Sequence, residues 1–263
     1  MSRIQEKFKS LNGNKALVAF YTAGDPDMSA SKDIFSSIEK GGADIIEIGV
    51  PFSDPLADGP TIQASSHRSL QNGTTLKKIV DLVADIRNQS ELPIVLMSSF
   101  NPVLVYGQKQ FVEDAVRAGV DGIILPDLPP EEAEGFLSYA NEHKMDMIFL
   151  LAPTSTPDRI QRIGEISKGF IYYVSLTGTT GTKSSLSKNL EEKVLAIKSK
   201  VKLPVLVGFG ISGSEQAREA TYSSDGVIVG SAIVKLVEQY SDPKERDKKI
   251  KSFVSGIKEA INS

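Results

Sequence analysis

The sequence contains no cysteine and only two histidines. The lack of cysteine excludes disulfide bonds, a thiolate metal site and a cysteine nucleophile, and it is consistent with a reducing compartment. His67 and His143 lie in predicted helical segments far apart in the sequence, so they indicate neither a metal site nor a catalytic triad. We therefore expect no metal in this protein.

An excess of basic residues is also missing, because the formal charge is -3 and the pI is near 5.6. Nucleic acids and anionic membranes attract clustered Lys and Arg, so neither is an expected partner. The longest apolar stretches, such as IFLLA and VLVGFG, have the length of a strand and not of a membrane span. The first residues, MSRIQEKFKSLNG, lack the apolar run of a signal peptide. We predict a cytoplasmic protein.

Eight short runs rich in β-branched residues or Leu are the strongest pattern in the chain. Amphipathic segments with helical spacing separate them, for example FVEDAVRAG from Phe111 and EEAEGFLSYANEHK from Glu131. Such alternation is typical of an α/β protein with a parallel sheet covered on both faces. The eight runs begin at Ala16, Ile45, Ile94, Gly122, Met147, Ile171, Pro204 and Gly226.

Eight strand–helix units in 263 residues match the size of a (β/α)₈ TIM barrel, and we predict one domain over residues 1–263. A doubly wound open sheet is the alternative, but the count of eight and the lack of a dividing linker favour the barrel. MSRIQEKFK is expected to form a helix that caps the barrel bottom. The long gap after the second strand predicts an extra helix, TIQASSHRSLQNG from Thr61.

Two carboxylic acids stand out near the end of the second strand. Glu47 lies between Ile46 and Ile48, and no Lys or Arg occurs between Lys40 and Arg68. An apolar setting raises a carboxyl pKa, as a general acid near neutral pH requires. The alternative for Glu47 is a salt bridge at the barrel rim.

Asp58 follows eleven residues later in a loop rich in Pro and Gly. Its alternative role is structural, because Asp58 or Thr61 could cap the helix that we expect to begin at Ile62. Asp54, which precedes a proline, is better explained by turn chemistry. We rank Glu47 first, Asp58 second and Asp54 a distant third as functional residues.

The loops after the last two strands predict a phosphate site. GFGISG, from Gly208 to Gly213, and GSAIV, from Gly230 to Val234, each follow a strand and open a helix. Helix N-termini bind anions, and these two loops are the usual phosphate cradle of a TIM barrel. The first loop also matches a dinucleotide pattern, but too few residues follow it for the rest of such a domain.

The sixth loop, SLTGTTGTKSSLS from Ser175 to Ser187, is long and contains Gly178 and Gly181 as candidate hinges. We favour a lid that closes over substrate, with a flexible linker as the alternative. Tyr172 in the preceding strand could point toward the carboxylates, although a buried core tyrosine with a satisfied hydroxyl is the competing interpretation.

The segment EIGVPFSDPLADGPTIQ from Glu47 closely resembles the signature of the tryptophan synthase alpha subunit family. Further matches follow the family order and span nearly the whole chain: FYTAGDP at Phe20, LPDLPPEE at Leu125, the lid from Ser175, GFGIS at Gly208 and GSAIV at Gly230. This resemblance implies a (β/α)₈ barrel that cleaves indole-3-glycerol phosphate to indole and glyceraldehyde 3-phosphate. It also implies a beta subunit partner that carries PLP, no cofactor in this chain, and an α₂β₂ tetramer.

The resemblance also implies residue roles. Glu47 would protonate the indole C3 and also serve as the hydroxyl base, Asp58 would accept a hydrogen bond from the indole N–H, and Tyr172 would complete the catalytic set. Asp127 would signal to the partner, and Thr180 would contact Asp58 when the lid closes. The implied substrate-binding residues are Phe20, Thr22, Phe100, Thr180, Gly181, Gly208, Phe209, Gly210, Gly230 and Ser231.

Two positions depart from the family pattern. Ser99 stands where many members have a hydroxylated aromatic residue of the indole pocket, and Thr179 stands where Val is common in the lid. These changes concern the shape of the pocket and the lid. A free-standing indole-releasing lyase, a phosphate-binding barrel isomerase and an inactive module that activates the beta subunit remain as alternatives.

Overall fold

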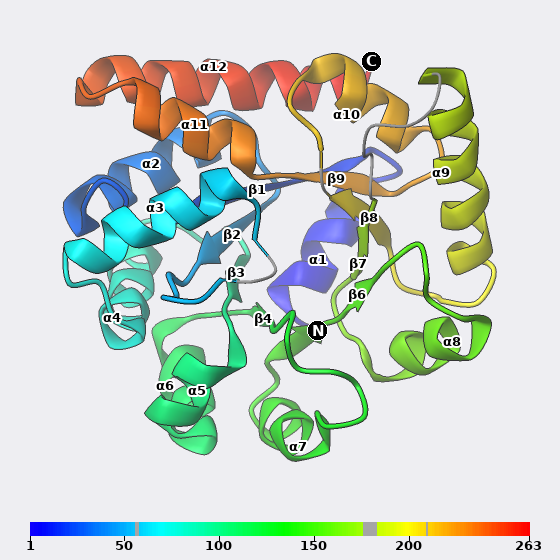
Figure 1. Cartoon of the computed structure of the whole chain (residues 1–263), viewed down its shortest axis with the longest axis horizontal. Helices are drawn as coiled ribbons and strands as arrows, with labels where there is room; N and C mark the ends of the chain where they lie inside the picture. Colours follow the sequence, from blue (N-terminus) through cyan, green and yellow to red (C-terminus); the bar gives the residue numbers. More distant parts are fainter. Residues whose placement is uncertain (56–57, 176–182, 209) are drawn as a thin grey trace.

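A computed structural model describes residues 1–55, 58–175, 183–208 and 210–263, except for the side chains of 183–188. Within these ranges, nine strands pair in parallel in one sheet with the order β5-β4-β3-β2-β1-β9-β8-β7-β6 (Figure 1). The strands are β1 Ala16–Thr22, β2 Ile45–Gly49, β3 Ile94–Met97, β4 Gly122–Ile124, β5 Asp146–Ile148, β6 Leu150–Leu151, β7 Ile171–Val174, β8 Val205–Gly208 and β9 Gly226–Val229.

The two ends of this order meet in one continuous stretch of chain. β5 pairs with β4 and β6 pairs with β7, and only Phe149 separates β5 from β6. The Phe149 carbonyl accepts a hydrogen bond of 3.2 Å from the Tyr172 N–H of β7, so pairing continues across the break. The barrel is therefore closed, the predicted (β/α)₈ fold is confirmed with its fifth strand divided in two, and the open-sheet alternative is wrong.

Helices surround the barrel and cover the outer face of its strands (Figure 1). The extra helix expected after the second strand is α3, whereas α5 was not predicted, and α7 begins three residues later than the segment from Glu131 indicated. The helices are α1 Arg3–Ser10, α2 Met28–Lys40, α3 Pro60–Gln71, α4 Leu76–Arg87, α5 Phe100–Tyr106, α6 Gln108–Ala118, α7 Glu134–Glu142, α8 Pro157–Ile166, α9 Lys183–Lys198, α10 Ser214–Thr221, α11 Ser231–Gln239 and α12 Pro243–Ile261.

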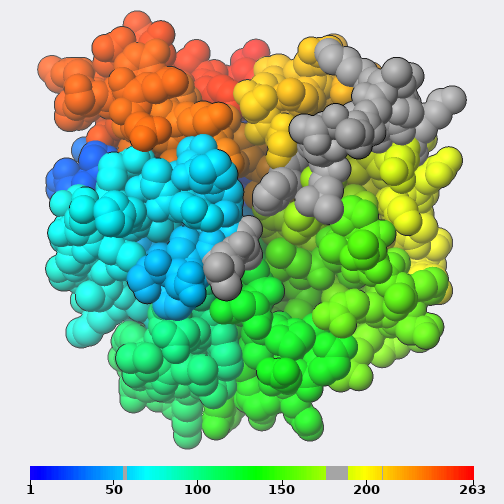
Figure 2. Space-filling view, viewed as in Figure 1, coloured from blue at the N-terminus to red at the C-terminus, as the bar shows by residue number. Residues whose placement is uncertain are grey.

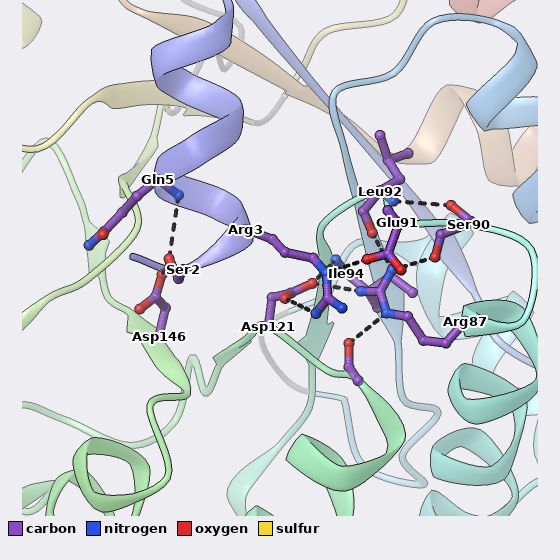
Figure 3. Close-up of polar contacts among 11 residues, drawn as sticks. Ser2, Arg3, Gln5, Arg87, Ser90, Glu91, Leu92, Ile94, Asp121 and Asp146 are labelled. Atoms are coloured by element: carbon purple, nitrogen blue, oxygen red, sulfur yellow. Dashed lines mark hydrogen bonds and ion pairs between the residues drawn. The ribbon is translucent and has the colours of Figure 1, made fainter.

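The barrel interior is a separate apolar core closed from below by α1. Ile4 of α1 is fully buried among inward-facing strand residues such as Val18, Ile45 and Val95. The Ser2 hydroxyl fixes the start of α1 by accepting the Gln5 N–H and donating to Asp146 (Figure 3). The predicted helical cap is confirmed, because α1 fills the barrel interior at this end.

Buried aspartates tie neighbouring strands together at the capped end. Asp121, just before β4, accepts the Ile94 N–H at 2.8 Å, while its own N–H donates to the Ile94 carbonyl at 2.9 Å. Arg87 and Arg3 donate to the same carboxylate at 2.6 and 3.1 Å (Figure 3). Asp44, just before β2, accepts hydrogen bonds from the Leu17 N–H and from Lys258. Asp225, just before β9, accepts hydrogen bonds from the Val205 N–H and from Lys198. These three aspartates therefore stabilise the pairing of neighbouring strands.

Candidate active site

Glu47 is a buried acid at the mouth of the barrel. It is paired in register with Phe20 of β1 and Val95 of β3, and it is only 1% exposed. In the described part of the chain Glu47 has no ion pair, and its Oε2 is buried without a hydrogen-bond partner. Burial raises the pKa of Glu47 to about 8, and the negative charge of Asp58 adds to this rise. Glu47 is therefore protonated at neutral pH, and the salt-bridge alternative finds no support.

Asp58 lies in the loop that leads into α3. The helix begins at Pro60, and its N-cap, Gly59, makes no side-chain capping bond. The alternative role, in which Asp58 or Thr61 caps a helix that begins at Ile62, is therefore wrong. Pro60 at the first helical position suits the start of this helix. Burial raises the pKa of Asp58 to about 6, so it is mostly ionised at neutral pH. Asp54 is exposed and lines a neighbouring cavity.

One cavity of about 420 Å³ contains both acids. Tyr172 reaches it from β7, and burial, followed by the charges of Glu47 and Asp58, raises its pKa well above the usual value. Figure 2 shows this end of the molecule, where the surface is hollowed near its centre beside the cyan segment that includes α3. The described lining is Phe20, Glu47, Asp58, Gly59, Pro60, Thr61, Ile62, Met97, Tyr172, Gly210, Ile211, Ile228, Gly230, Ser231 and Lys235.

Gly208 makes room for Tyr172 and is not part of the described lining. A Cβ on Gly208 would lie 2.6 Å from the Tyr172 hydroxyl oxygen and 2.5 Å from a ring carbon. Any side chain there would displace the tyrosine. The tyrosine is thereby held against the end of β8, next to the loop that carries Gly210.

The far wall of the cavity is a helix N-terminus. Gly230 is the N-cap of α11 and Ser231 is its first residue, and both line the cavity. Gly210 has φ +78°, a backbone conformation that favours glycine. The first N–H groups of α11 and the helix dipole suit an anion at this wall. Thr180, Gly181 and Phe209 of the predicted site lie outside the described residues.

A second cavity of about 230 Å³ adjoins the first and shares Phe20 and Asp58 with it. Thr22, Ser99 and Asp127 also line it. The Thr22 hydroxyl forms a 2.7 Å hydrogen bond with the Ser65 hydroxyl, so it holds α3 against β1. Ser99, the departure from the family pattern, thus faces a space in which its short side chain leaves more room.

The structure does not bring Phe100 to either described cavity. Phe100 is the first residue of α5, and its ring lies edge-on to Phe136 with centroids 6.1 Å apart. Its N–H donates to the Asp127 carboxylate at 2.8 Å, so Asp127 fixes the start of this helix. The sequence patterns did not predict α5, so they did not predict that Phe100 packs against Phe136 of α7.

Lys235 is a lining residue that we did not predict. The signal was available, because residues four apart in a helix share a face and Lys235 is four residues after Ser231.

Within the described ranges, no three His, Asp or Glu side chains gather as a metal ion would require.

Two carboxyl groups with different pKa values thus share a cavity with a helix N-terminus. Comparisons with known proteins give the family of the chain. The family model of the tryptophan synthase alpha chain matches residues 7–262. The chain belongs to this family. It cleaves indole-3-glycerol phosphate and is the lyase subunit that serves tryptophan biosynthesis.

Relatives of the tryptophan synthase alpha chain match over their whole length. The Geobacter sulfurreducens alpha chain is 50% identical over 265 residues, with 100% of each chain covered. The Geotalea uraniireducens alpha chain is also 50% identical, covering 100% of this chain and 99% of the relative. Among solved structures, the Legionella pneumophila str. Paris alpha subunit has a TM-score of 0.93 and 36% identity, covering 99% of this chain and 98% of that one.

Within the described residues, no helix combines the length and hydropathy needed to cross a bilayer.

Proposed function

We propose that Glu47, Asp58 and Tyr172 perform the cleavage of indole-3-glycerol phosphate in the larger cavity. The observation that carries this assignment is the pair of carboxyl groups in one cavity with different protonation states. Glu47 holds a proton near neutral pH, and Asp58 does not. Two such groups can act as acid and as hydrogen-bond acceptor in the same step.

In the proposed reaction, Glu47 donates its proton to the indole C3. Asp58 accepts a hydrogen bond from the ring N–H, where positive charge develops. The bond between C3 and the glycerol carbon then breaks, and ionised Glu47 takes the proton of the hydroxyl on that carbon, which becomes the aldehyde. This transfer restores protonated Glu47, and indole and glyceraldehyde 3-phosphate leave. Tyr172 lines the same cavity as both acids and would bound the substrate there.

Substrate binding divides between two sides of the cavity. Gly210, Gly230 and Ser231 would hold the phosphate through backbone N–H groups, together with Gly181 and Phe209. Phe20 would bound the indole ring, together with Thr22 of the adjoining second cavity, and Gly208 contributes by positioning Tyr172. Thr180 would contact Asp58 when the lid closes.

The family implies a beta subunit partner. We propose that the assembly is an α₂β₂ tetramer in which PLP belongs to the beta subunit, and that Asp127 takes part in signalling between the subunits. Exposed Asp127 beside the second cavity, bonded to the start of α5, supports this role. We also propose one domain over residues 1–263 and a cytoplasmic location.

The deciding test is indole release by the wild type and by Glu47→Gln, alone and with a stoichiometric beta subunit. The variant should lose at least about 10²-fold in kcat, because a positioned acid is typically worth about 10² to 10⁴ in rate. Asp33→Asn, on the exposed side of α2, is a matched control and should be as active as the wild type. Full turnover by Glu47→Gln would refute the assignment. Rapid release without the partner would instead indicate a free-standing lyase.

A further inference from the structure

Lys235 is a cation in a cavity whose other described charged residues are acids. The described lining holds Glu47 and Asp58 and no second Lys or Arg. Lys235 is exposed, and within the described part of the chain it has no hydrogen-bond or ion-pair partner. Its charge is therefore available to a ligand.

The position of Lys235 on α11 directs it toward the helix N-terminus. It follows Ser231 by four residues, a rise of about 6 Å along the same helix face. Helical side chains lean back toward the N-terminus, and the flexible stem of Lys carries its ammonium in that direction. The ammonium thus approaches the anion-binding wall formed by Gly230 and Ser231.

The charges that line the cavity favour a role for Lys235 in binding a phosphate group. A phosphate monoester brings a charge of about -1.5 to -2 at neutral pH, and a helix N-terminus offsets only about half a charge. Asp58 is ionised in the same cavity and repels the phosphate. Without a further cation, the binding of the dianion is opposed by this repulsion.

We propose that Lys235 binds the phosphate group of the substrate and thereby determines the KM of the cleavage reaction. This inference rests on the proposed function, which takes the N-terminus of α11 as the phosphate site. Lys235 acts at a distance from the indole ring, so it contributes to substrate binding and not to the chemical step.

The test compares Lys235→Met with Lys235→Arg, which keeps the charge, and with Lys248→Met on α12, which removes one charge outside the cavity. For Lys235→Met we expect KM to rise about fivefold, since a partly exposed charge pair is worth about 1 kcal/mol, with kcat changed less than twofold. Lys235→Arg and Lys248→Met should stay within twofold of the wild type. Calorimetric binding of inorganic phosphate should weaken in Lys235→Met by a similar factor and become less dependent on salt.

Phosphate binding by Lys235→Met equal to that of the wild type would overturn the proposal, as would equal weakening in Lys248→Met. Equal loss in Lys235→Arg and Lys235→Met would overturn the role of charge. Calorimetry needs no turnover, so it decides the role of Lys235 even if the wild type released no indole, a result that would defeat only the proposed function.

Discussion

At the scale of single residues, the site depends on how differently two carboxyl groups meet water. Glu47 lies in the wall of the barrel, where the loss of solvation penalises its charge, and Asp58 lies on a loop that keeps more contact with solvent. The charge of Asp58 adds to the rise in the pKa of Glu47, whereas the pKa of Asp58 is raised by burial alone.

The pH dependence of kcat/KM should be bell-shaped. The active form needs ionised Asp58 and protonated Glu47, so activity should fall below about pH 6 and above about pH 8. In Asp58→Asn the acidic limb should disappear and the alkaline limb should move to lower pH, because the charge that raises the pKa of Glu47 is gone. Rate profiles of both proteins test this, and an unmoved alkaline limb in the variant would contradict the coupling.

The buried proton of Glu47 should also be visible in stability. The folded-state pKa of about 8 lies above the ordinary value of 4.5, so the folded protein binds more protons and loses stability as pH rises between these values. From pH 4.5 to 7 this loss should amount to roughly 3 kcal/mol, at 1.36 kcal/mol per pH unit. Urea unfolding of the wild type and Glu47→Gln at both pH values measures it. The difference between the two proteins should change by this amount, and parallel pH curves would show that Glu47 is ionised when folded.

At the scale of elements, Arg68 joins the helices on the two sides of the cavity. It lies on α3, donates two 2.8 Å hydrogen bonds to the buried carboxylate of Asp25, and donates a third of 2.8 Å to Glu238 of α11. The loop before α3 carries Asp58, and the first residue of α11 is Ser231. One guanidinium therefore links the helix next to the acid to the helix that forms the anion-binding wall.

Arg68→Met should lower both stability and kcat/KM. Asp25 would be left buried without its cation, at a cost of about 3 kcal/mol, and α3 would lose its fixed position. Arg68→Lys should recover only part of both, because an ammonium cannot form the paired bonds of the planar guanidinium. Urea unfolding and kcat/KM would be measured beside Lys77→Met, which breaks only an exposed pair with Asp81. A result for Arg68→Met equal to that of this control would contradict the link.

At the scale of the whole molecule, the barrel separates stability from chemistry. Bonded aspartates and α1 close one end, while the acids and the helix N-terminus gather at the other. This separation agrees with the general rule that catalytic groups of TIM barrels come from loops after the strands.

Asp121→Asn should therefore destabilise the protein without changing its catalysis. Arg87 would lose its anionic partner at a site where both side chains are under a tenth exposed, which should cost about 3 kcal/mol. Asp81→Asn, in the exposed pair with Lys77, should cost less than about 0.5 kcal/mol. Thermal unfolding would give the stabilities, and kcat/KM should match the wild type at a temperature where both variants are folded. Loss of activity in folded Asp121→Asn would show that the two ends are coupled.

The sequence by itself determined the strand positions, the closed barrel, the extra helix α3 and the choice of Glu47 and Asp58. These features depend on local patterns: apolar runs of strand length, helical spacing, and acids without a basic neighbour. The family resemblance added the roles of residues that the patterns left open.

The tertiary structure decided what depends on contacts between distant parts of the chain. The fifth strand divides at Phe149, with its first part paired to β4 and its second part to β7. Phe100 packs against Phe136 as the first residue of α5. Burial by the surrounding strands and loops raises the pKa values of Glu47 and Asp58. Lys235 lines the cavity because α11 packs beside β1. Desolvation and proximity are properties of the folded barrel, so no window of sequence could specify them.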